Sequence, residues 1–190
     1  MEIDQAITQL GAKLDQWFNG NLPTFASHDL EAQSKALLRG FELAKELDRL
    51  KAEGLAAIRA QLNRRDALTD EQYAASLVRS FEFAAKLKHT LHDELLDTDG
   101  ETKVVRLMNN IADSLGAMSS GRAALALLLD NQDARVRASA GAYLIKLMPE
   151  RVVPILRGVQ ETERGNSAHF TAYWAVRSWE LEGKPTATNK

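Results

Sequence analysis

The segment LLLDNQDARVRASA, residues 127–140, decides the fold of this chain. It joins an apolar helix end to a polar turn and to a second helix that opens as Asp133-x-x-Val136-Arg137-x-x-Ala140. This succession is typical of the point where one helical hairpin passes the chain to the next in stacked helical repeats. The segment therefore predicts antiparallel helix pairs in this part of the protein.

Short helices are predicted on both sides of this turn. Pro149 follows an apolar helix end, and proline suits the first turn of a helix. The helix that follows Asp133 carries apolar residues on two sides, as expected of an inner helix that neighbours cover on both faces. The periodicity places helices at about 102–115, 120–130, 133–147, 150–163 and 167–182.

A first amphipathic helix is predicted at the start of the chain. Apolar residues recur at helical spacing from Ile3 to Phe18. We expect Asn19-Gly20-Asn21 to end this helix, because glycine and asparagine are common where helices stop. A loop with Pro23 in it is then predicted before the next helix.

Two longer helices follow, and they echo one another. The first is capped by one of residues 27–29 and runs to about Asn63. The second begins at Thr69, where Thr-Asp-Glu-Gln has the form of a capping box. Residues 37–47 can be laid over residues 77–87 at an offset of 40. Matched Phe and Leu faces predict that these two helices pack as a long antiparallel hairpin.

The echo also places Arg39 with Arg79, and Glu42 with Glu82, in equivalent positions. Arginine and glutamate three residues apart commonly pair along one helix surface, and such pairs are weak. We favour that interpretation. Glu42 and Glu82 are nonetheless kept as candidate partner-binding residues.

The composition bounds the fold class. The chain has 190 residues, is 45% hydrophobic and holds only four prolines, and it lacks the alternating pattern of strands. We therefore expect an all-α protein, with a long N-terminal helical hairpin in front of antiparallel helix pairs. The polar run at 97–100 is the expected boundary between region 1–100 and region 101–190.

Charge and hydrophobicity bear on location and on partners. The longest apolar run is far shorter than the roughly 20 residues that span a bilayer, and the acidic start lacks the form of a secretory signal, so a cytoplasmic protein is expected. Residues 1–100 carry 12 Lys and Arg against 17 Asp and Glu. This acidic half argues against nucleic acid and favours a basic protein partner.

Few residues suggest catalysis or metal binding. His89 and His92 lie three apart on one helix face, but no Glu-x-x-His motif accompanies them, so we expect a solvated helix surface rather than a metal site. The chain has no cysteine, no Gly-x-Ser-x-Gly elbow and no Gly-rich phosphate loop. We predict no catalytic residues, no metal and no cofactor.

The last helix carries the strongest candidates for binding a partner. Phe170, Trp174 and Leu181 share one side with Tyr173 beside them, and Arg177 falls within this apolar arc. Trp179 points to the opposite side, which has no later repeat to cover it. Trp179 is therefore a candidate contact residue, together with Arg177 and Tyr173, although it can instead pack on the N-terminal half.

Charged residues cluster at the turn of the deciding segment. Asp130, Asp133, Arg135 and Arg137 are expected to cap helices and to pair between repeats. Recognition of a partner is the alternative, and Arg135 is kept as a candidate for it.

Residues ~120–182 resemble HEAT-like helical repeats. The resemblance rests on a core of the form "Asp-x-x-Val-Arg-x-x-Ala-x-x-x-Leu" and on Pro-Ile-Leu in the next helix. The matching residues are Leu128, Asp133, Val136, Arg137, Ala140, Leu144, Pro154, Ile155 and Leu156. More narrowly, the stretch is similar to short bacterial HEAT-like domains, some of which are similar to immunity proteins of secreted or contact-dependent toxins.

This resemblance implies a non-enzymatic protein-binding module. Its sharper form is an immunity protein, or antitoxin, that occludes a bacterial toxin, with the acidic residues of 1–100 steering it onto a basic partner. A scaffold or regulatory adaptor, including one that binds itself, is the first alternative. Nucleic-acid binding is less favoured, since it needs arginines gathered on one concave face: Arg135, Arg137, Arg151 and Arg157.

Overall fold

The computed structural model describes residues 3–182. Within that range the chain forms eight α-helices and two short 3-10 helices, and it forms no strand, so the predicted all-α class is confirmed. The elements are α1 (Ile3–Phe25), α2 (Leu30–Leu62), η1 (Arg65–Ala67), α3 (Asp70–Asp93), α4 (Thr98–Gly116), α5 (Gly121–Ala126), η2 (Leu127–Asp130), α6 (Ala134–Leu144), α7 (Pro149–Thr162) and α8 (Ser167–Glu182).

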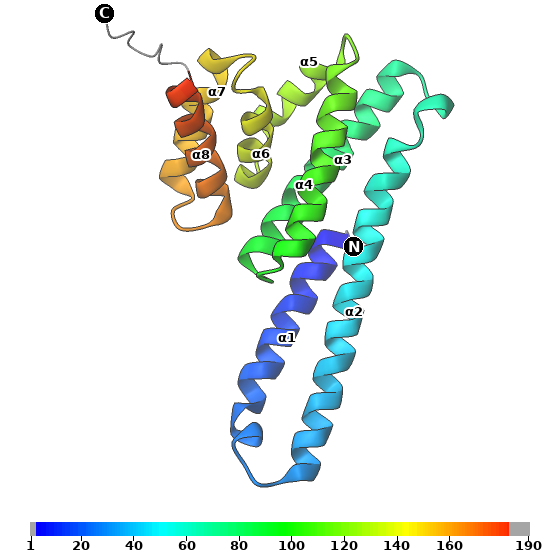
Figure 1. Ribbon diagram of the computed structural model, residues 1–190, viewed down its shortest axis with the longest axis vertical. Coiled ribbons are helices and arrows are strands. Elements are labelled where there is room, and N and C mark those ends of the chain that lie inside the picture. Colours follow the sequence, from blue (N-terminus) through cyan, green and yellow to red (C-terminus); the bar gives the residue numbers. More distant parts are fainter. Residues whose placement is uncertain (1–2, 183–190) are drawn as a thin grey trace, which may run out of the picture.

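A long hairpin of α1 and α2 extends away from a body built by the later helices (Figure 1). The 33-residue α2 begins where the Asp29 side chain accepts a hydrogen bond from the Ala32 amide at 3.0 Å. Its first half pairs with α1, and its second half runs along the body (Figure 1). The predicted N-terminal hairpin is therefore present.

The partner within that hairpin differs from the predicted one. We expected the helix after Asp29 to pair with the helix after Thr69, but α2 packs mainly on α1, and α3 packs mainly on α4. The echoed residues consequently have opposite surroundings: the Phe41 side chain is 69% exposed, whereas its equivalent Phe81 is fully buried. The matched pattern thus correctly predicted two helices but not a shared interface.

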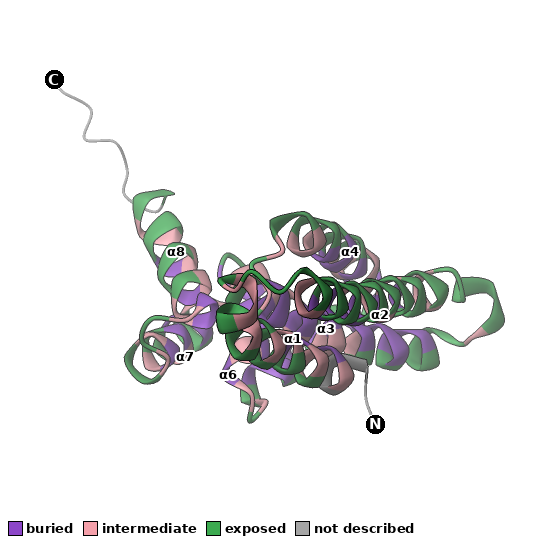
Figure 2. Cartoon of the chain, turned by 90° about the horizontal axis from the view of Figure 1, so that it is seen from below, coloured by how far each residue is buried: buried purple, intermediate pink, exposed green. Residues whose placement is uncertain are grey.

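The body is organised around α3. The Thr69 hydroxyl and the Gln72 side chain form the predicted capping box at the start of α3. At its end, Leu96 adopts the left-handed φ of 50°, and the Asp97 amide donates to the Leu91 carbonyl at 2.8 Å. Helices α1, α2, α4, α5, α6 and α8 all contact α3, and buried residues gather where the helices face one another (Figure 2).

The short helices after α3 follow the predicted order and almost the predicted bounds. They pack as antiparallel pairs, with α6, α7 and α8 in mutual contact. Pro149 is the first residue of α7, as expected. Pro154 is the sixth residue of α7, just past its first turn, so the Glu150 carbonyl lacks an i+4 amide partner.

The predicted end of the first helix was wrong. Helix α1 continues through Gly20 and Pro23 to Phe25. Gly20, Pro23 and Asn19 all lie on the exposed side, so water can bond the carbonyl that Pro23 leaves without an amide partner. Contact with α2 then holds this last stretch helical.

One core runs from α1 to α8. Its buried residues reach from Ile7 to Val176. Lys51 of α2 also bonds Asp97, the cap of α4, at 2.8 Å. The division into regions 1–100 and 101–190 stays a prediction. No helix among the described residues has both the length and the apolar character that crossing a bilayer requires.

Candidate functional site

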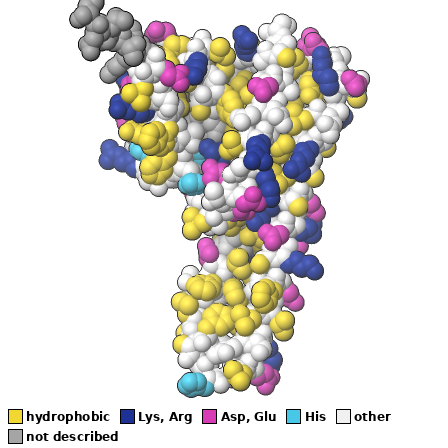
Figure 3. All heavy atoms as spheres, viewed as in Figure 1, with side chains coloured by type: hydrophobic (Ala, Val, Ile, Leu, Met, Phe, Trp, Pro, Cys, Tyr) yellow, Lys and Arg dark blue, Asp and Glu magenta, His cyan; other side chains and the backbone are white. Residues whose placement is uncertain are grey.

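The most prominent unpartnered face of the body is the outer side of α8. Three small or branched residues, Ala168, Ala172 and Val176, are buried against α6 and α7. The opposite side of α8 carries large exposed side chains, and hydrophobic side chains gather there beside basic ones (Figure 3). We call this the α8 outer face: Phe170, Tyr173, Trp174, Arg177 and Leu181.

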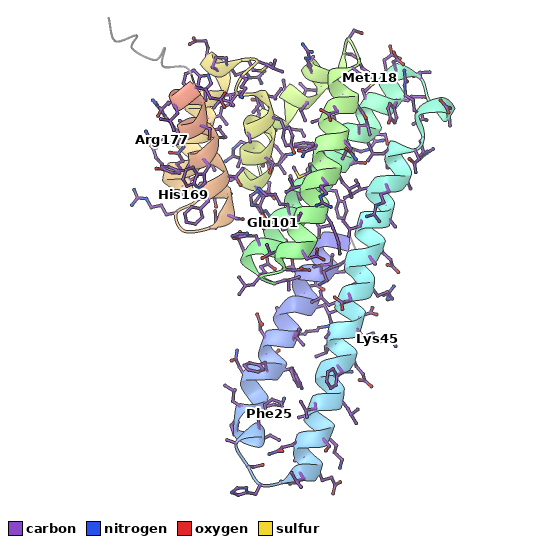
Figure 4. All side chains as sticks on the ribbon, in the orientation of Figure 1. Phe25, Lys45, Glu101, Met118, His169 and Arg177 are labelled. Atoms are coloured by element: carbon purple, nitrogen blue, oxygen red, sulfur yellow. The ribbon has the colours of Figure 1, made fainter. Side chains whose placement is uncertain are left out.

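Aromatic rings form the centre of the α8 outer face. Trp174 is 61% exposed, and its ring meets that of Tyr173 edge to face at a centroid distance of 5.3 Å. Phe170 lies one turn before Trp174 and is 50% exposed. Arg177 is exposed one turn after Tyr173 (Figure 4), so a guanidinium group lies on the same helix face as the aromatic rings.

The two sides of α8 are reversed relative to our expectation. Trp179 was named as a candidate contact residue, with packing on the N-terminal half as the alternative; it is only partly exposed and packs against the core. The side with Phe170 and Trp174 is the uncovered one. The helical wheel correctly grouped these residues, yet a wheel cannot tell which of two apolar sides meets the rest of the protein.

A buried polar network fixes the start of α8. The His89 side chain of α3 is fully buried, with Nδ1 2.5 Å from Ser167 Oγ and Nε2 3.2 Å from Ser139 Oγ. Ser167 donates its hydroxyl to Asp93 at 2.7 Å, and its amide donates to the same carboxylate at 2.9 Å. One imidazole therefore joins α3, α6 and α8.

The protonation state of the network follows from its bonds. A carboxylate can only accept hydrogen bonds. The Ser167 hydroxyl therefore donates a hydrogen bond to Asp93 and accepts one from the N–H at His89 Nδ1. Nε2 then accepts from Ser139, and the ring is neutral. Burial, reinforced by the positive charges of Lys88 and Arg135, lowers the pKa of His89 to about 3.

This network corrects the prediction of a solvated histidine pair. His92 is exposed and lies 2.8 Å from Glu101, but His89 is enclosed and has both ring nitrogens bonded. In a catalytic triad the histidine lies between serine and acid, whereas here Ser167 lies between His89 and Asp93. Within residues 3–182 no group of three acidic or histidine side chains could hold a metal ion.

The charged residues of the turn before α6 cap that helix and pair with a neighbouring helix, as predicted. Asp133 caps α6 by accepting from the Arg135 amide at 2.9 Å, and the Arg135 guanidinium bonds the same carboxylate at 2.7 Å. Burial opposes ionisation of Asp133, but the Arg135 bonds outweigh it and hold the Asp133 pKa below its ordinary value. Asp130 pairs with Arg151 of α7 at 2.8 Å.

The arginines of the nucleic-acid alternative are therefore engaged. Arg137 donates to the carbonyls of Asn131 and Gln132, and Arg157 lies 3.1 Å from Glu180 of α8. Each of these side chains already has a protein acceptor for part of its five N–H donors.

The acidic candidates of the echo lie apart from α8. Glu42 pairs with Arg39 at 2.9 Å on the exposed surface of α2, as expected. Glu82 pairs instead with Lys86, one turn later on α3, at 3.0 Å. The structure thus brings Tyr173 and Arg177 together, and it places Glu42, Glu82 and Arg135 elsewhere.

The fold and the α8 outer face define an all-helical protein with a preformed aromatic surface on its last described helix. No protein-family model, no curated protein and no solved structure matches the chain.

Proposed function

We propose that this protein is a non-enzymatic protein-binding module and that the α8 outer face is its binding surface. The single observation that carries the proposal is the cluster of Trp174, Tyr173 and Arg177 on one exposed helix face. Tryptophan, tyrosine and arginine are the residue types that dominate binding energy at protein interfaces. Large apolar patches on a protein surface often mark sites of interaction with another protein.

The seating of α8 supports this proposal. Asp93 receives two hydrogen bonds at the start of the helix, and Lys88 of α3 donates to Thr171 at 2.8 Å one turn later. Two exposed ion pairs, Arg157 with Glu180 and Lys146 with Glu182, add weak contacts at the far end. A helix whose backbone is already held in place loses little backbone entropy when a partner binds.

The sharper form of the proposal is an immunity protein, or antitoxin, that occludes a basic bacterial toxin. The resemblance of residues ~120–182 to HEAT-like domains and the acidic surplus of residues 1–100 support this form. A scaffold or regulatory adaptor would use the same face for a constitutive partner that is not toxic.

A comparative pull-down tests the binding surface. Tagged wild-type protein and a Trp174→Ser, Arg177→Ser variant are incubated with nuclease-treated lysate of the native host at about 0.15 M salt, where long-range attraction between exposed charges is screened. Leu127→Ser is the matched control, because Leu127 is an equally exposed large apolar residue at 68% but lies outside α8.

We expect wild type and the Leu127 control to retain one stoichiometric partner that the α8 variant loses at least tenfold. Equal recovery by all three proteins would contradict the assignment of the α8 outer face. A partner that is toxic when expressed alone, and harmless when co-expressed with wild type, would support the antitoxin form over the scaffold form.

A further inference from the structure

The hairpin carries a second uncovered apolar surface that the α8 face does not involve. Six large apolar side chains on α1 and α2 are 47% exposed or more, and all of them except Leu38 recur at helical spacing on one side. On each helix these residues are offset in the same rotational direction from the residues that face the other helix: each lies one position after, or three before, such a residue. Because the two helices are antiparallel, all five side chains project to the same side of the hairpin. We call this the apolar hairpin face: Phe18, Leu22, Leu30, Leu37 and Phe41.

Figure 3 shows hydrophobic side chains gathered over the outer half of the hairpin. The opposite side is polar. It carries Gln16 on α1, and on α2 it carries Lys35, Arg39, Glu42 and Glu46, all exposed. The hairpin is therefore amphipathic as a unit, with one apolar and one charged side.

Little core supports this part of the molecule. Between residues 12 and 45 the buried residues are Ala36, Gly40 and Leu43, two of them small. Trp17 fills the gap between the helices, and its indole nitrogen is buried there without a hydrogen-bond partner among the described residues. A pair of helices with so little between them resembles half of a four-helix bundle.

We propose that a second copy of this chain covers the apolar hairpin face, so that two hairpins pack as an antiparallel four-helix bundle. The area is sufficient. With side chains of about 200 Å² each, the exposed fractions correspond to about 600 Å² of apolar surface per copy. Two copies reach about 1,200 Å², near the lower bound of a specific interface. The hairpin extends clear of the body, so a second hairpin can approach it (Figure 1).

The charge of the hairpin disfavours an anionic membrane as the occupant. Residues 1–48 hold eight acidic and four basic side chains, whereas helices that lie on anionic lipid carry a basic polar side. Both copies bring the same acidic surplus, so added salt should leave the association unchanged or strengthen it.

Sedimentation equilibrium of the full chain from about 1 to 100 µM tests the proposal. We expect wild type to dimerise and Phe41→Glu to weaken dimerisation at least tenfold, because Phe41 is exposed and a buried carboxylate would oppose pairing. Gln16→Glu adds the same charge on the polar side and should associate like wild type. Circular dichroism checks that all three proteins fold alike.

Cross-linking gives an independent result. The chain has no cysteine, so Leu37→Cys and Gln16→Cys each provide one thiol for a short bismaleimide. We expect covalent dimers from Leu37→Cys and none from Gln16→Cys. A wild type that stays monomeric at about 100 µM, equal cross-linking of both thiols, or flotation of monomers with phosphatidylcholine–phosphatidylglycerol vesicles would each overturn the proposal.

Discussion

His89 shows how one residue fixes the position of a whole helix. Its imidazole is fully buried and bonds serines 50 and 78 residues further along the chain. Sequence reasoning placed it on a solvated surface, because histidine on a helix is usually exposed and nothing near it in sequence marks its partners. Only the folded chain brings Ser139 and Ser167 to it.

The lowered pKa of His89 predicts acid sensitivity. Its folded-state pKa of about 3 lies below the ordinary value of 6.5, so between these pH values the unfolded chain binds the additional proton. The free energy of unfolding should therefore fall as pH falls from 6.5 toward 3, by about 1.4 kcal/mol per pH unit from this group alone.

Urea unfolding of wild type and His89→Gln at pH 7, 6 and 5 checks this prediction. Other titrating groups are common to both proteins, so the difference between the two slopes isolates His89. We expect the variant to start less stable and to lose about 2 kcal/mol less than wild type between pH 7 and pH 5. Parallel slopes would show that His89 titrates alike in both states.

At the scale of the element, α1 and α2 show why helices can be predicted more easily than their contacts. Caps and periodicity correctly placed α2 and the start of α3. The echoed residues Phe41 and Phe81 share the same local pattern, but α3 is enclosed by neighbours whereas the start of α2 extends beyond them. Burial depends on the rest of the chain, so the pattern could not distinguish them.

Two glycines in the hairpin predict opposite effects of one substitution. A Cβ at Gly40 would overlap the ring of Trp17, whereas a Cβ at Gly20 would meet nothing within 4 Å. Gly20→Ala should raise the free energy of unfolding by about 0.5–1 kcal/mol, because alanine restricts the unfolded chain and favours the helix.

Gly40→Ala should instead lower the free energy of unfolding by about 1–3 kcal/mol, because the rigid indole and the backbone must move apart. Thermal or urea unfolding followed by circular dichroism measures both changes. If both substitutions stabilise, the close approach of Trp17 to α2 is not the packing in solution.

For the whole molecule, fold class, helix order and most helix bounds followed from composition, capping and periodicity. The candidate site followed only in part. Tyr173 and Arg177 were named, but the covered side of α8 was not predictable, since it depends on where α6 and α7 lie. The apolar hairpin face was not predicted either, because its exposure depends on where the other helices lie.

Uneven packing predicts uneven hydrogen exchange. Few residues between 12 and 45 are buried, whereas α3 is buried along most of its length. At dilutions where single copies predominate, amides of the hairpin tip should exchange by local opening, many times faster than those of α3. Exchange followed by mass spectrometry measures this, and similar protection of both segments would count against it.

The bond between His89 and Ser167 closes a loop of 78 residues, and this has a consequence for synthesis. On the ribosome, α3 emerges long before the serine that completes its polar network. Until α8 is made, the His89 imidazole lacks one partner and the faces of α6 and α7 that α8 covers remain open. The packing of α6 and α7 therefore cannot be completed before α8 has emerged from the ribosome.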